Sequence, residues 1–237
     1  MRLIKVIAGG AMVVLLVILL TRPHPSVRKT TELYQKVADR AEAVAKNDLG
    51  LRYTTGHGVP KDLGKAAELF QKAAVKGYAV AQTNLGLLYE AGAGVPKDLG
   101  KAAELFQKAA DQGNAVAQSN LGWYYETGQS VPKDLGKATE LYQKAAAQEN
   151  FYAQNNLGRL YATGQGVSKD SGKAAALFQK AADQGYAGAQ RNLGLLYATG
   201  EGVPKDLGKA AELFQKAADQ GDEFATTILK RLSGEND

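Results

Sequence analysis

Side chains that commonly carry chemistry are sparse in this chain of 237 residues, which contains no cysteine and only two histidines. The lack of cysteine removes disulfides, thiol nucleophiles and cysteine-zinc sites together. His24 and His57 are far apart in sequence, and neither has a second histidine at metal-ligand spacing. We therefore expect no metal site and no cofactor.

Three patterns imitate catalytic motifs without meeting their requirements. The loop GVPKDLGKA resembles a phosphate-binding loop, but no Ser or Thr follows its last Lys, and a helix precedes it where a strand is needed. Ser26 and Ser130 are each followed three residues later by Lys, but the chain contains neither the Ser-Asp-Asn nor the Lys-Thr-Gly motif that would complete a Ser-x-x-Lys active site. Glutamates recur at a fixed interval, which indicates a solvated face and not two converging carboxylates: Glu68, Glu104, Glu140 and Glu212. The residues indicate a protein that is not an enzyme.

The fixed interval extends to most of the sequence. Twenty residues, GVPKDLGKAAELFQKAADQG, appear unchanged at 94–113 and 202–221. A Leu-Gly pair recurs every 36 residues, at Leu49-Gly50, Leu85-Gly86, Leu121-Gly122, Leu157-Gly158 and Leu193-Gly194. Such a period predicts a solenoid, in which each unit buries its apolar face against its neighbours.

Each period is predicted to fold as helix, loop and helix. In the second copy, apolar residues stand at helical spacing over 79–90, and Pro96 lies in the interruption that follows. Asp98 is an expected N-cap for a second helix, which Gly113 should end. The predicted fold class is all-α, an antiparallel helix-pair solenoid.

The run AVAQTNLGLLYEAGAGVPKDLGKAAELFQKAADQG resembles the Sel-1-like repeat, a relative of the tetratricopeptide repeat. The resemblance places a half repeat at 30–40, a C-terminal capping helix at 221–232 and a disordered tail at 233–237. Between them it divides the chain into five units: 41–76, 77–112, 113–148, 149–184 and 185–220. It implies a right-handed superhelix that acts as an adaptor, scaffold or regulator by binding other proteins.

The first residues differ from the repeats. An uncharged apolar run from Val6 to Leu20 is long enough to cross a membrane, which predicts an uncleaved signal anchor over 1–22 and a proline-containing linker over 23–29. The alternative is a signal peptide cleaved near Ser26. We expect a single-pass protein of the bacterial inner membrane with a periplasmic array, or a secreted or periplasmic protein if cleavage occurs.

The net charge of +5 does not indicate nucleic-acid binding. Five cations and no acid lie before residue 30, and the remaining cations and acids balance. A neutral array offers no broad electrostatic surface to a phosphate backbone.

Comparison of the copies separates packing from candidate binding positions. With 100° per residue, the constant residues of each first helix share one face and the variable residues lie on the opposite face. The resemblance implies that first helices line the concave side of the superhelix, so the variable face is the predicted groove. The predicted partner-binding residues lie there: Leu87, Glu90, Trp123, Glu126, Tyr152, Asn155, Arg159, Arg191 and Leu195.

Asn155 and Arg159 are four residues apart on one helix and together could hold a carboxylate. The predicted partner is therefore a peptide or protein helix with an acidic group. The competing interpretation is that these positions vary only because they are exposed, with Trp123 filling space between units and both arginines solvated. The predicted function is a membrane-anchored interaction scaffold of a bacterial envelope; the alternative is an envelope enzyme related to peptidoglycan or β-lactams.

Overall fold

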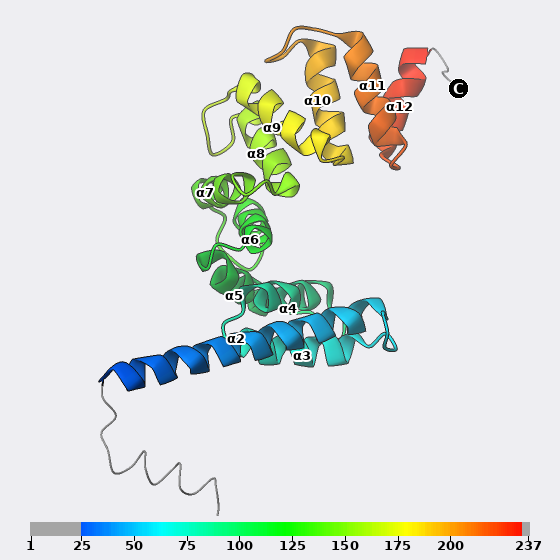
Figure 1. The fold of residues 1–237 in the computed structure, drawn as a ribbon. Coiled ribbons are helices and arrows are strands. Elements are labelled where there is room, and N and C mark those ends of the chain that lie inside the picture. The colour runs from blue at the N-terminus through cyan, green and yellow to red at the C-terminus, as the bar shows by residue number, and fades with distance from the viewer. Residues whose placement is uncertain (1–24, 234–237) are drawn as a thin grey trace, which may run out of the picture.

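The computed structural model describes residues 25–233, and in this part of the chain all regular structure is helical (Figure 1). The elements in order are α2 Pro25–Thr55, α3 Leu63–Val75, α4 Ala79–Ala91, α5 Leu99–Asp111, α6 Ala115–Thr127, α7 Leu135–Ala146, α8 Phe151–Thr163, α9 Ser171–Asp183, α10 Ala187–Thr199, α11 Leu207–Ala218 and α12 Glu223–Ser233. Five helix pairs, from α2–α3 to α10–α11, form copies one to five, and α12 covers the end of the stack. The predicted helix-pair solenoid is confirmed.

Two local signals recur along the array, an aspartate before each second helix and, in most copies, a glycine after it. An aspartate caps each second helix; the Asp98 carboxylate, for example, accepts a hydrogen bond of 3.0 Å from the backbone amide of Lys101. Gly113, after the second helix of copy two, has a φ of 87°, a left-handed conformation that ends the helix as expected.

The Leu-Gly pair is constant because of a ring contact inside each copy. A Cβ added at Gly122 would lie 2.8 Å from the ring of Tyr142, and the same approach occurs at Gly86 toward Phe106 at 2.7 Å. The aromatic ring of the second helix therefore packs directly on the backbone of the first helix. A larger residue at this glycine would push the two helices apart.

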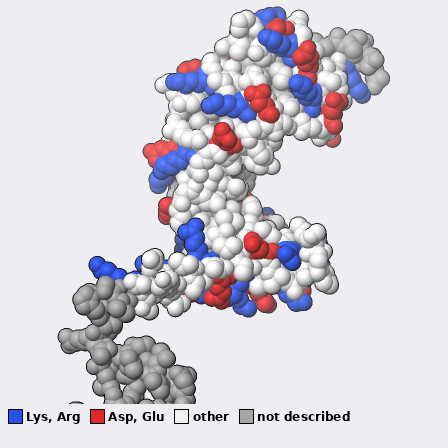
Figure 2. Space-filling model, in the orientation of Figure 1, with Lys and Arg blue, Asp and Glu red and all other residues white. Residues whose placement is uncertain are grey.

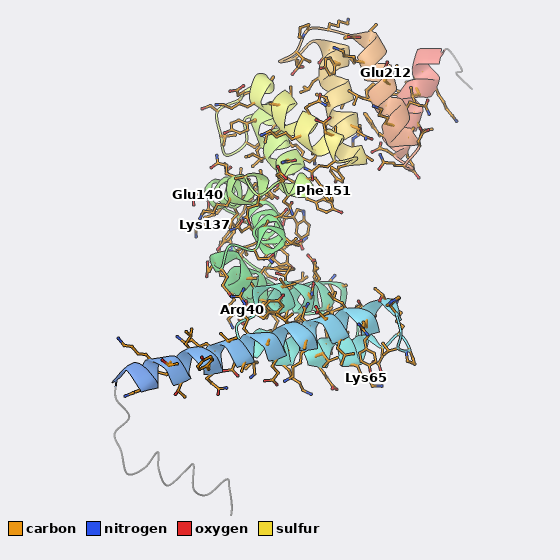
Figure 3. All side chains as sticks on the ribbon, viewed as in Figure 1. Arg40, Lys65, Lys137, Glu140, Phe151 and Glu212 are labelled. Carbon is orange, nitrogen blue, oxygen red and sulfur yellow. The ribbon has the colours of Figure 1, made fainter. Side chains whose placement is uncertain are left out.

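The stack bends, and α4, α6 and α8 line the inner side of the bend (Figure 1). The space-filling view shows a hollow between the two ends of the stack, with a largely uncharged wall on the face that is visible (Figure 2). Outer positions behave as the sequence predicts: Lys137 and Glu140 are exposed on the opposite side of the bend (Figure 3).

The N-terminal organisation differs from the prediction. The linker over 23–29 and the half repeat over 30–40 were expected as separate pieces, but α2 runs without a break from Pro25 to Thr55. Proline is compatible with a first helical position, since the missing amide would be unpaired there. At 41 the chain has Ala41 within the helix, whereas the equivalent positions 77, 113, 185 and 221 have glycine and 149 has a glutamate in a left-handed conformation. Two residues of the linker, 23 and 24, lie outside the described part.

The predicted membrane anchor over 1–22 also lies outside the described residues, as do residues 234–237 of the predicted tail. Among the helices that the structure describes, none is sufficiently long and apolar to cross a membrane. The capping helix is present, with bounds Glu223–Ser233 instead of 221–232.

Candidate functional site

The exposed candidates lie at two positions of the first helices. One position is two residues after the Leu of each Leu-Gly pair, and the other is that of Tyr152, five residues before this Leu. Leu87 of α4 is 37% exposed and Tyr152 of α8 is 51% exposed, which is high for large apolar side chains. Trp123 of α6 and Leu195 of α10 are half-buried, and Arg159 of α8 is exposed. These five side chains remain accessible to a partner.

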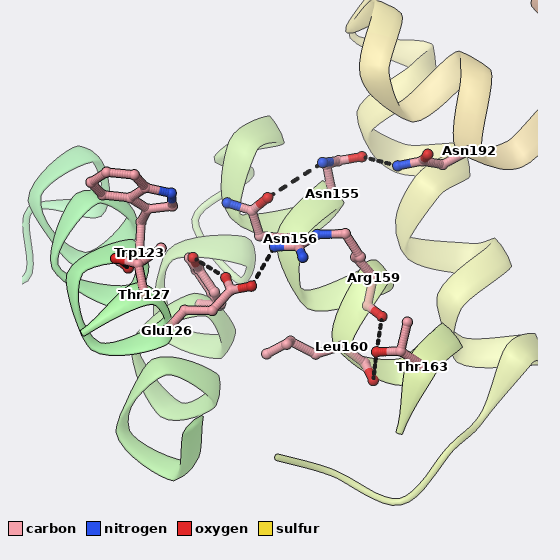
Figure 4. Close-up of polar contacts among 10 residues, drawn as sticks. Trp123, Glu126, Thr127, Asn155, Asn156, Arg159, Leu160, Thr163 and Asn192 are labelled. Carbon is pink, nitrogen blue, oxygen red and sulfur yellow. Dashed lines mark hydrogen bonds and ion pairs between the residues drawn. The ribbon is translucent and has the colours of Figure 1, made fainter. Parts of the chain in front are cut away.

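Other variable residues are buried in the array. Asn155 is 7% exposed, and its Oδ1 accepts a hydrogen bond of 2.9 Å from Nδ2 of Asn192 in the next first helix (Figure 4). Asn84 donates in the same way to Asn47 at 2.9 Å. The assignment of Asn155 to the binding surface is therefore wrong, since its side chain joins two copies.

Glu126 is also internal. It is 8% exposed, its Oε2 accepts a hydrogen bond of 2.8 Å from the Tyr142 hydroxyl, and its Oε1 forms an ion pair with Arg159 of the following copy (Figure 4). Burial and the Glu126 carboxylate raise the pKa of the Tyr142 hydroxyl, so that hydroxyl stays a proton donor. Glu126 therefore links three helices and is not available to a partner.

Both arginines of the predicted site already have acidic partners. Arg159 pairs with Glu126, and Arg191 pairs with Asp222 at 2.7 Å while its guanidinium lies 5.8 Å from the centre of the Phe224 ring. The acidic group that the sequence led us to expect on a partner is supplied by the chain itself. These contacts differ from both earlier interpretations. Asn155 and Arg159 do not form an open site for a partner's carboxylate, and the two arginines are not simply solvated.

Glu90 occupies the position of Glu126 one copy earlier but has a different environment. It is half-buried beside Tyr124, and burial raises the pKa of its carboxyl. The Tyr124 hydroxyl is buried without a hydrogen bond of regular geometry in the described structure, and burial, followed by the Glu90 charge, raises its pKa. No arginine follows here, because the residue equivalent to Arg159 is Trp123.

An aromatic cluster that the prediction included only in part surrounds Tyr152. The ring centre of Tyr152 lies 4.3 Å from that of Phe151 and 5.1 Å from that of Tyr186. The ring centres of Phe151 and Tyr186 are 5.3 Å apart. Figure 3 shows Phe151 on the inner side of the bend. Tyr186 stands at an N-cap position where copies three and four have asparagine, and it makes no side-chain cap. The tyrosine in place of asparagine was the sequence feature that could have indicated this aromatic cluster.

The remaining titratable candidates, His57 and the repeated glutamates, lie on the surface of the described chain. Over 25–233 no group of histidine, aspartate and glutamate side chains has the arrangement that a metal ion needs. His57 is an exposed loop residue. The repeated glutamates Glu68, Glu104, Glu140 and Glu212 are all exposed, as a solvated outer face requires.

A family model, the Sel1 repeat, matches five consecutive segments: 43–78, 79–114, 115–150, 151–186 and 187–222. The chain belongs to the Sel1 repeat family. Its members are generally protein-interaction scaffolds without catalytic activity. The matched segments begin two residues later than the units that the sequence analysis drew and cover the same five helix pairs, with α2 included only from residue 43.

Solved structures agree with this membership. A Sel1 repeat protein from Oxalobacter formigenes is 34% identical, with a TM-score of 0.74, over 79% of this chain and 75% of that protein. The c5321 protein of uropathogenic Escherichia coli, described as a protective antigen with an SLR fold, is 36% identical with a TM-score of 0.71; the match covers 85% of this chain but only 43% of that protein. The immunity protein Pa5087 from Pseudomonas aeruginosa is 30% identical with a TM-score of 0.50, over 81% of this chain and 68% of that protein. No curated protein matches this Sel1 repeat chain.

Proposed function

We propose that this Sel1 repeat protein is a bacterial envelope scaffold that binds a partner protein or peptide on the inner side of copies two to five. The observation that carries the proposal is the set of apolar and aromatic side chains left accessible there, namely Leu87, Trp123, Tyr152 and Leu195. Aromatic side chains contribute most to interface energies. Because the nearby arginines are paired internally, the partner is expected to present apolar side chains to this surface.

We also propose that the chain is anchored in the inner membrane by residues 1–22, with the array in the periplasm. The support is the uncharged run from Val6 to Leu20 and the absence of small residues at its end, which a cleavage site would require. The alternative is a secreted or periplasmic protein cleaved near Ser26. The N-terminal sequence of the mature protein separates the two, since a chain beginning near Ser26 would refute the anchor.

The binding surface is tested by site-specific photo-cross-linking of the full chain in its own cells. A photoreactive residue at Tyr152 should give a discrete cross-linked species with one partner protein. The same residue at Glu140, on the outer side, is the matched control and should give none. Equal cross-linking from both positions would refute the inner side as the binding surface.

A further inference from the structure

The N-terminal part of α2 projects beyond the rest of the stack (Figure 1). Residues 28–38 are all exposed, and among them are large apolar side chains: Leu33 at 61%, Tyr34 at 71% and Val37 at 59%. In copy two the residue equivalent to Tyr34 is Phe106, which is fully buried. A group of exposed apolar side chains of this kind marks a candidate interaction surface.

Coordinated exchanges accompany the unbroken α2 at the point where the other copies turn. Glu42 replaces the Asn or Asp found at that position in copies three, four and the cap, and Lys46 and Lys76 replace two glutamines that bond to each other in later copies. Lys76, at the end of α3, pairs with both Asp39 and Glu42 at 2.6 Å, and Lys46 also pairs with Glu42. Hydrogen bonds from Lys46 and Lys76 lower the pKa of Glu42 to about 2, so this clamp persists at neutral pH.

The clamp and the apolar stripe lie on different sides of α2. At 100° per residue, Asp39, Ala43 and Gly50 define the side that faces α3, and the side centred on Tyr34 and Val37 is roughly opposite. The stripe therefore points away from the array to which α2 belongs. No later part of the described chain covers it, since residues 28–38 remain exposed.

The spacing of the stripe specifies the kind of partner. Alternating intervals of three and four residues separate Val27, Thr30, Tyr34, Val37, Ala41 and Val44. This is the a and d pattern of a left-handed coiled coil, and it ends at the next position, which is the charged Asp48. In a parallel pair, residues beside the seam of one helix face residues beside the seam of the other. Leu33 would face Ala38 and Arg40 would face Ala45, so no like charges would meet.

We propose that α2 pairs with α2 of a second copy as a short parallel coiled coil, which carries the two arrays outward on opposite sides. The parallel direction rests on the proposed membrane anchor, because two anchored chains enter the same membrane side by side. Two and a half heptads are marginal by themselves, so the pairing depends on the high effective concentration that a common membrane supplies.

The chain contains no cysteine, so single cysteines report this pairing directly. The full chain in membranes carries Val37→Cys at a d position or, as the matched control, Lys36→Cys on the side away from the seam. Because paired d positions come within disulfide range, oxidation should give on the order of tenfold more covalent dimer from Val37→Cys than from Lys36→Cys. Equal and low yields would overturn the proposal.

Two further outcomes identify other arrangements. Dimer formed only when Val27→Cys and Ala41→Cys chains are mixed would indicate an antiparallel pair and overturn the parallel one. A monomeric Val37→Cys chain whose attached fluorophore is quenched by nitroxide lipids would place α2 on the membrane surface, and pairing would again be wrong. Fractionation of the same cells tests the anchor separately: dimer in a chain that does not sediment with membranes would support pairing but contradict both the anchor and the dependence of pairing on it.

Discussion

The junction between copies two and three and the junction between copies three and four place glutamate at the same position in different surroundings. Glu126 is buried with a tyrosine hydroxyl and an arginine as partners, whereas Glu90 is half-buried beside a tyrosine hydroxyl that makes no regular hydrogen bond. The difference follows from three exchanges. Within the copy, Phe106 at the first junction is replaced by Tyr142 at the second. In the next copy, Tyr124 is replaced by Leu160 and Trp123 by Arg159. A variable residue can therefore serve either the joint between copies or the exposed surface, and only its contacts distinguish these roles.

The largest effect on stability is expected at the second junction. Arg159→Met leaves the buried Glu126 carboxylate with the Tyr142 hydroxyl alone, and should lower the free energy of unfolding by about 1–2 kcal/mol. Leu87→Met changes the equivalent position of copy two at similar volume and should cost well under about 1 kcal/mol. Urea denaturation followed by circular dichroism measures both. Equal losses would show that the ion pair contributes nothing beyond packing, and adding Glu126→Gln to Arg159→Met should restore part of the loss.

Removal of a tyrosine hydroxyl should have different effects on stability at the two junctions. The effect at Tyr142 should be a loss, although phenylalanine is the residue that the other copies have there. Tyr142→Phe introduces the residue that other copies carry, yet it should lower stability by about 1 kcal/mol because Glu126 loses a donor. Tyr124→Phe removes a hydroxyl that lacks a regular hydrogen bond, and should leave stability unchanged or raise it. The same denaturation measurement checks this pair. A larger loss for Tyr124→Phe would mean that the comparison of the two sites is wrong.

A strained residue lies beside the second junction. Glu149 has a φ of 62° at the position where copy two has Gly113 with a φ of 87°. A side chain in this left-handed region costs about 1 kcal/mol, so Glu149→Gly should raise the melting temperature. Gly113→Ala is the reciprocal change and should lower it, since nothing lies within 4 Å of the added Cβ and only the backbone conformation is penalised. A melting temperature that falls for Glu149→Gly would assign the glutamate side chain a stabilising contact.

The smallest expected effect is a pH dependence of stability that arises from Glu90 at the first junction. Burial raises the pKa of Glu90 above its ordinary value of 4.5, so the folded chain binds this proton more tightly than the unfolded chain does. Stability from this group therefore rises as the pH falls through the raised pKa, and at neutral pH the buried carboxylate is destabilising. Glu90→Gln should raise the melting temperature at pH 7, and the gain should shrink toward pH 4. A gain that is equal at both pH values would exclude ionisation as its cause.

The repeat period, the helix pairs and their caps could be predicted from the sequence because each depends on local residues such as Asp98 and Gly113. Asn155 was assigned to the surface because a single helical wheel does not include the next first helix, whose Asn192 covers it. Arg159 was given to a partner for the same reason, since Glu126 lies 33 residues earlier in the chain. The continuous α2 was signalled by Ala41 in place of a glycine, but resemblance to a half repeat favoured a turn there.

The central claim is that accessible inner-side residues, and not the buried joints, bind a partner. The most direct test is the affinity of the full chain for the protein cross-linked at Tyr152, measured for Trp123→Ala with Tyr152→Ala and for Lys137→Ala with Glu140→Ala as the outer-side control. We predict that the inner-side variant weakens binding at least about tenfold, or about 1.4 kcal/mol, while the control binds as the original chain does. Unchanged affinity of the inner-side variant in a folded array would contradict the account.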